Sequence, residues 1–169
     1  MPIAISKSKT IKVSADQLWS ILGDDFANVG EWARAVDSSA VNLEAPTIEG
    51  ADIGGRVCQA PGFGAINETF TSFDPEERSY AFVATASKIP SFVRNITNHT
   101  KITPIGPNQS KLEVAITADT EGLRGALVKP MMTRKFSTTI DSLFEDIAVY
   151  AETGEVSEGK TKALVKAGR

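Results

Sequence analysis

The chain has 169 residues, a formal net charge of -3 at pH 7 and 41% hydrophobic residues. These values are typical of one folded domain, and they argue against a disordered chain and against a generally basic surface for nucleic acid. One cysteine, Cys58, excludes an internal disulfide, and with one histidine, His99, it cannot supply a Cys/His zinc site. No apolar run has the length of a membrane-spanning helix or a signal peptide. We therefore expect a cytoplasmic protein without metal or cofactor.

The N-terminal residues predict one strand followed by two short helices. Residues 3–13 alternate apolar and polar side chains, which is typical of a strand with one face in water. Ser14 and Gln17 have the spacing of a capping box, in which each side chain bonds the backbone of the other residue. A short helix is therefore expected over 15–22, and the spacing of apolar residues predicts a second one over 25–32.

The middle of the chain predicts a series of antiparallel strands. Connectors rich in proline, glycine, aspartate and asparagine separate them, and connectors this short join strands as hairpins. Phe73 lies on the opposite parity from Phe70, which indicates a bulge in its strand. The candidate strands span residues 41–43, 56–59, 65–73, 79–86, 92–103 and 111–120.

A long amphipathic helix is predicted after the last strand. Its apolar stripe consists of Val128, Met132, Phe136, Ile140, Leu143, Ile147 and Tyr150. Pro130 falls inside this pattern, so the helix should begin or bend there, and Gly154 should end it. Residues 155–169 lack aromatic residues and periodicity, which predicts a flexible C-terminal tail.

Several local motifs accompany this order of elements: Ser14-Ala15-Asp16-Gln17-Leu18-Trp19, Gly23-Asp24, Trp32, Gly55-Arg56-Val57, Asn67-Glu68-Thr69-Phe70, Phe73-Asp74-Pro75, Ser79-Tyr80-Ala81-Phe82 and Ile102-Thr103-Pro104. In them the chain resembles the helix-grip superfamily of birch-type pollen allergens, START lipid-transfer domains and bacterial polyketide cyclase/dehydrase-like (SRPBCC) proteins. The resemblance implies an α+β fold, in which a curved antiparallel sheet of about seven strands wraps around the long helix. It also implies a single domain over residues 1–154 and a hollow between the sheet and the helix.

Strand alternation predicts which side chains face this hollow. The expected ligand-binding residues are Ile66, Phe70, Tyr80, Phe82, Arg94, Ile96, Asn98, Thr100, Val114, Ile116, Met132, Phe136 and Ile140. Glu68 shares this face and is the candidate acid/base, with the alternative that it forms a salt bridge at the rim. Since a buried charge is costly unless paired, Glu68 is expected to meet Arg94, water or a ligand. His99 has the opposite parity and should face solvent.

Three functions are compatible with such a hollow, because the fold alone does not determine a reaction. The favoured one is binding of a small hydrophobic or amphipathic ligand, such as a lipid, a quinone or an aromatic polyketide-like molecule. The second is a cyclase or dehydrase that uses Glu68 as acid/base, so catalysis stays open. The third is a co-chaperone-like module, which requires an exposed apolar patch. No nucleic-acid partner and no integral membrane association are expected, and the sequence leaves the oligomeric state open.

Overall fold

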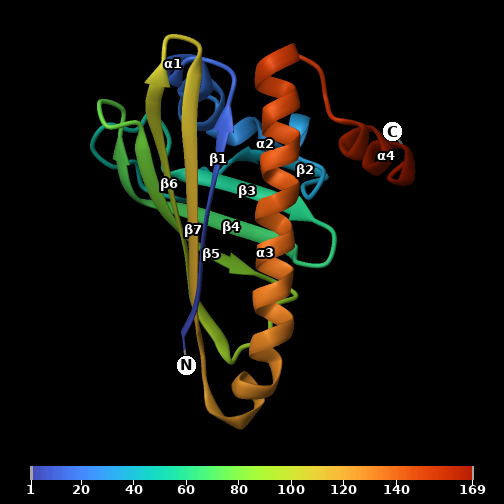
Figure 1. Ribbon diagram of the computed structural model, residues 1–169. Coiled ribbons are helices and arrows are strands. Elements are labelled where there is room, and N and C mark those ends of the chain that lie inside the picture. The colour runs from blue at the N-terminus through green and yellow to red at the C-terminus, as the bar shows by residue number, and fades with distance from the viewer. Residues whose placement is uncertain (1, 169) are drawn as a thin grey trace.

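A computed structural model describes residues 2–168, in which seven antiparallel strands form one sheet beside a long helix. The strands are β1 (Pro2–Ile11), β2 (Ser38–Val41), β3 (Gly55–Ala60), β4 (Gly64–Asp74), β5 (Ser79–Ala86), β6 (Val93–Gly106) and β7 (Gln109–Thr120). Their order is β1-β7-β6-β5-β4-β3-β2, so the first strand pairs with the last. Figure 1 shows β1, β6 and β7 running along the helix while β3 and β4 cross behind it. The curved sheet and the helix confirm the predicted helix-grip fold.

Short helices connect β1 to β2, as the sequence predicts. They are α1 (Ala15–Trp19), a π-helical turn η1 (Ser20–Asp24), a 3-10 turn η2 (Phe26–Asn28) and α2 (Val29–Trp32). The Ser14 hydroxyl accepts from the Gln17 backbone N–H at 3.2 Å. The Gln17 side chain does not complete the capping box, because its amide donates to the Ala151 carbonyl at 3.1 Å. This bond connects the start of α1 to the long helix.

The long helix α3 (Gly122–Thr153) buries Met132, Phe136, Ile140 and Ile147 of the predicted stripe, while Val128, Leu143 and Tyr150 are half-buried. It begins at Gly122 and continues through Pro130, so the helix does not begin at the proline. It ends before Gly154, whose φ of 76° lies in the left-handed region that glycine tolerates. Phe144, which the predicted stripe omits, is also buried in the core.

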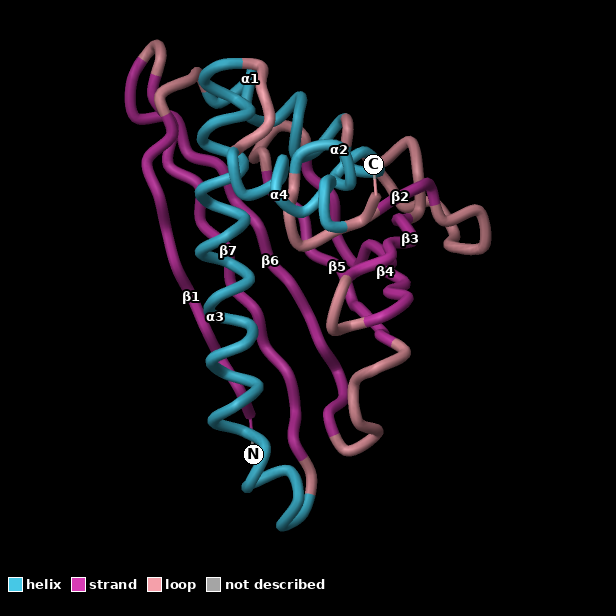
Figure 2. Tube along the Cα trace, turned by 90° about the vertical axis from the view of Figure 1, so that its right-hand side faces the viewer, coloured by secondary structure: helices cyan, strands magenta, loops and turns pink. Residues whose placement is uncertain are grey.

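The segment expected to be a flexible tail contains a further helix, α4 (Glu158–Lys166), which lies beside α2 in Figure 2. The Ser157 hydroxyl caps it by accepting from the Lys160 N–H at 3.0 Å. The Lys160 side chain is only 1% exposed. Its ammonium group donates to the carbonyls of Gly30, Ala33 and Val36 at 2.6, 3.1 and 2.8 Å. Because α4 is held by hydrogen bonds of Lys160, its sequence has no apolar stripe. The spacing of apolar residues therefore does not predict this helix.

None of the helices within residues 2–168 is long and apolar enough to cross a lipid bilayer.

Candidate functional site

A cavity of about 150 Å³ lies between the sheet and α3. Its walls come from α2 and the loop after it, from β3 to β7, and from α3, and most of the lining side chains are apolar. The predicted residues that line this cavity are Ile66, Phe82, Ile96, Asn98, Val114, Ile116, Phe136 and Ile140, together with Glu68. Alternation along the strands and the helix stripe therefore bring these nine residues together.

Four other predicted residues lie near the cavity or in the core. Tyr80 and Thr100 line a second cavity of about 40 Å³, which shares Phe82 and Asn98 with the larger one. Phe70 is buried against Phe26, with ring centroids 4.4 Å apart. The last residue, Met132, is buried in a core cluster beside the cavity-lining residues Phe63 and Phe136.

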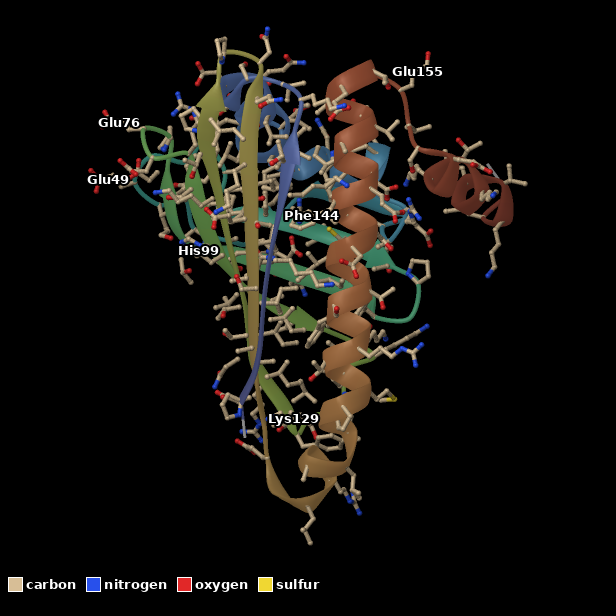
Figure 3. The ribbon with its side chains drawn as sticks, in the orientation of Figure 1. Glu49, Glu76, His99, Lys129, Phe144 and Glu155 are labelled. Atoms are coloured by element: carbon tan, nitrogen blue, oxygen red, sulfur yellow. The ribbon has the colours of Figure 1, made fainter. Side chains whose placement is uncertain are left out.

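Arg94 does not face the cavity, contrary to the prediction. Its side chain is 60% exposed, and its guanidinium donates to the Ser91 carbonyl at 3.0 Å. The reason is a β-bulge between Arg94 and Thr97 in β6, where Asn95 has a φ of 50°. One extra residue reverses the alternation, so that residues before the bulge point to the opposite side from those expected. After the bulge the predicted parity holds, and His99 is exposed on the face of the sheet away from α3 (Figure 3).

The partner of Glu68 is Arg56, which faces it directly across the β3–β4 pair. The Arg56 Nε donates to a Glu68 carboxylate oxygen, and both residues are buried. The Arg56 Nη1 donates to the Phe26 carbonyl at 2.7 Å, and the guanidinium carbon lies 3.8 Å from the centre of the Phe26 ring. Arg56 is not among the site residues predicted from the sequence, although Cys58 and Ala60 on the same parity mark that face of β3 as buried.

The Arg56–Glu68 pair keeps hydrogen-bonding capacity that no protein group in the described chain takes up. Within residues 2–168, the second terminal nitrogen of Arg56 donates to no protein oxygen, and Glu68 Oε1 accepts no hydrogen bond. Both residues line the larger cavity. Neither atom is fully buried, since within residues 2–168 the buried side-chain polar atom without a partner is Ser110 Oγ alone. A polar group of a ligand in the cavity can therefore reach both atoms.

The ionisable groups around the pair have shifted pKa values. Burial raises the pKa of Cys58 to about 11, and the Glu68 carboxylate adds to this rise while Arg56 opposes it. Burial also raises the pKa of Tyr80 above its ordinary value. For Arg56, burial lowers the pKa, but Glu68 together with Cys58 and Tyr80 outweighs burial, so the pKa is raised. At neutral pH the guanidinium therefore stays charged while the thiol and the phenol stay neutral.

A second polar cluster, formed by Arg34, Asp146, Ser157 and Lys160, lies where α2, α3 and α4 meet. Asp146 accepts from the Arg34 backbone N–H at 2.7 Å, from the Arg34 Nε at 2.9 Å and from the Ser157 hydroxyl. Asp146, Ala33 and Val36 also line the cavity. Helix α4 therefore holds one wall of the cavity in place.

Comparison with solved structures agrees with the fold described above. Three solved structures of similar fold are a Streptomyces sp. R1128 Zhui aromatase/cyclase, a Mycobacterium smegmatis START superfamily protein and a Thalictrum flavum norcoclaurine synthase point mutant in complex with a transition state analogue. Their TM-scores are 0.73, 0.69 and 0.64, and their identities 14%, 16% and 14%. The matches cover 90%, 90% and 89% of this chain and 94%, 99% and 94% of theirs. At such identities the likeness shows the fold alone.

A search of curated protein sequences gives no match. The sequence profile of the family described as "Polyketide cyclase / dehydrase and lipid transport" matches residues 2–152, which is most of the chain and includes β1 to β7 and nearly all of α3. The chain belongs to this polyketide cyclase / dehydrase and lipid transport family.

Proposed function

We propose that the cavity binds a small, mainly apolar and uncharged molecule that carries a hydroxyl or carbonyl group. The observation that carries this proposal is the half-used Arg56–Glu68 pair in an otherwise largely apolar lining. Binding sites commonly combine apolar walls with a few convergent polar groups. Membership of a family described by cyclase, dehydrase and lipid-transport functions supports the same class of ligand.

The volume limits the size of the ligand. An apolar cavity of about 150 Å³ accommodates one six-membered ring. The adjoining cavity of about 40 Å³ adds room for a small substituent, since the two share Arg56, Phe82 and Asn98. A larger lipid or polyketide requires the walls to move apart.

The charges select the polar group of the ligand. A carboxylate in the cavity would be repelled by Glu68, and an ammonium group would be repelled by Arg56. A neutral hydroxyl can accept from the second terminal nitrogen of Arg56 and donate to Glu68 Oε1. Asn98 Oδ1 accepts from the Thr100 hydroxyl at 2.9 Å, which leaves the Asn98 amide hydrogens as further donors.

Isothermal titration calorimetry with phenol, benzoate and benzylamine tests this selection. Phenol is expected to bind, and the two charged rings are expected to bind at least tenfold more weakly, about 1.4 kcal/mol. Ala84→Leu fills the cavity from β5 and should abolish phenol binding. The matched control is Ala81→Leu, on the same strand at the opposite parity, which should leave it unchanged. The proposal would be overturned if phenol did not bind the wild type, or if Ala84→Leu bound phenol as tightly as the wild type does.

A second candidate function is catalysis, favoured by the contact between Glu68 and Arg56 at the cavity wall. The Glu68 carboxylate would take a proton from a carbon next to a carbonyl, while Arg56 stabilises the enolate oxygen that forms. The proton would return from Glu68 to the product, so no redox partner is needed. Glu68→Gln should then lower turnover by about 100-fold or more while phenol still binds. Turnover unchanged by Glu68→Gln would exclude this role.

A further inference from the structure

We propose that the first turns of α3 dock on an anionic lipid surface. Leu123, Leu127 and Met131 are exposed to 86%, 81% and 59%. Their spacing of four residues places them on one face of the helix, and we call this face the α3 stripe. Core-facing helices expose polar residues on this side, so three large apolar residues in succession need a partner.

The charges near the α3 stripe point to an anionic partner. Between Glu121 and Asp141 the sequence contains Arg124, Lys129, Arg134 and Lys135 and no acidic residue. The whole chain has a net charge of -3, so positive charge is concentrated on this segment. An apolar stripe flanked by basic residues is the pattern of helices that lie in the membrane interface.

The two arginines are available to such a partner, whereas one lysine is not. Arg124 and Arg134 are exposed and form no salt bridge within the part of the chain that the structure describes. The Lys135 ammonium donates to the Gly62 carbonyl at 2.5 Å and lies 3.9 Å from the centre of the Phe63 ring. We therefore assign the electrostatic part of docking to Arg124 and Arg134.

The α3 stripe lies at the end of the molecule opposite α1, α2 and α4 (Figures 1 and 2). Figure 3 labels Lys129 in this same region of α3. On the inner side of these turns, Val128 packs on the core cluster that contains Phe63 and Phe136, which line the cavity. A docked helix would therefore bring this end of the cavity to the membrane, where apolar molecules accumulate.

A second copy of the chain fits the α3 stripe less well than a membrane. Symmetric packing of two stripes would place Arg124 and Arg134 of one copy near the same residues of the other. The like charges would oppose such a dimer, whereas anionic lipid headgroups neutralise them.

Vesicle flotation of the ligand-free protein tests the docking. We expect binding to vesicles of phosphatidylcholine mixed with phosphatidylserine, no binding to phosphatidylcholine alone, and weaker binding as salt is raised. Arg124→Gln with Arg134→Gln should lower the affinity about 25-fold, because each basic residue near the surface contributes about fivefold. Leu123→Ser with Leu127→Ser should lower it about tenfold or more.

Leu43→Ser is the matched control, since Leu43 is a highly exposed leucine far from α3 in sequence, between β2 and β3. It should leave flotation unchanged, and circular dichroism should show that all variants fold. The proposal would be overturned if the wild type did not bind the anionic vesicles, or if the arginine and leucine variants bound them as tightly as the wild type does. So would a dimer in sedimentation that Leu127→Ser dissociates, because the stripe would then be an interface between copies. None of these readouts depends on phenol binding, so docking and ligand binding can fail separately.

Discussion

Two polar clusters border the same cavity, and they differ in how completely the protein satisfies them. In the cluster of Arg34, Asp146, Ser157 and Lys160, both Asp146 oxygens accept hydrogen bonds and the lysine ammonium donates to three carbonyls. In the Arg56–Glu68 pair, within residues 2–168, the second terminal nitrogen of Arg56 donates to no oxygen and Glu68 Oε1 accepts no hydrogen bond.

The comparison separates a structural role from a binding role. A buried polar network with every bond made adds rigidity and has nothing left to offer a ligand. A pair with spare donors and acceptors at the surface of a cavity can form hydrogen bonds to a polar group that enters the cavity. Both clusters combine basic and acidic side chains, and the unused hydrogen-bonding capacity distinguishes the Arg56–Glu68 pair.

The largest expected loss of stability follows from breaking the Arg56–Glu68 pair. Arg56→Met leaves the Glu68 carboxylate buried without its partner, which should lower the free energy of unfolding by about 3–5 kcal/mol in urea denaturation. The double variant Arg56→Met with Glu68→Leu should recover most of this loss, because an apolar pair of similar volume carries no uncompensated charge. A double variant as unstable as the single one would contradict this reading.

The next largest loss of stability is expected from changing Lys160 in the cluster of Arg34, Asp146, Ser157 and Lys160. Lys160→Met removes the donor shared by the Gly30, Ala33 and Val36 carbonyls. This change should lower the free energy of unfolding by about 2–3 kcal/mol. Lys162→Met provides the control, because Lys162 pairs with Glu158 on the exposed side of α4 and should contribute about 0.5 kcal/mol or less. Equal thermal shifts for the two variants would mean that α4 is not held by Lys160.

Cys58 reports whether the Arg56–Glu68 side of the cavity is dry. With its pKa raised to about 11, the thiol has about 100-fold less thiolate at pH 8 than an ordinary cysteine. A disulfide reagent such as DTNB should therefore react slowly with the folded protein and fully in urea. Because the folded pKa lies above the unfolded one, this thiol favours the folded state below about pH 9, and the contribution is lost towards pH 11. Fast reaction at pH 8 would show that water reaches Cys58.

A smaller effect is expected on ligand charge selection. Glu68→Gln removes the negative charge while keeping the shape, so Arg56 becomes the only charge of the pair. Benzoate should then bind about tenfold more tightly than to the wild type, while phenol binding changes little. Calorimetry with both ligands checks this, and unchanged benzoate affinity would mean that Glu68 does not face the ligand.

The fold and most cavity walls follow from periodicity, but two features do not. Residue parity places Ile96 and Asn98 correctly, yet it fails at Arg94, because the bulge at Asn95 has no strong signal in the sequence. The parity of Cys58 and Ala60 marks the Arg56 face of β3 as buried, but the pairing of Arg56 with Glu68 depends on strand register, which tertiary structure determines. Helix α4 is held by hydrogen bonds of Lys160 instead of an apolar face, which hydrophobic patterns cannot predict.

The most direct test of the binding site is to observe the ligand inside the cavity. Nuclear Overhauser effects between phenol and the labelled methyl groups of Ile66, Ile116 and Ile140 would do so, since these side chains come from β4, β7 and α3 and line the cavity together. We predict contacts from bound phenol to all three isoleucines. Contacts confined to exposed methyl groups such as those of Leu43, or none at saturating phenol, would contradict a ligand site between the sheet and α3.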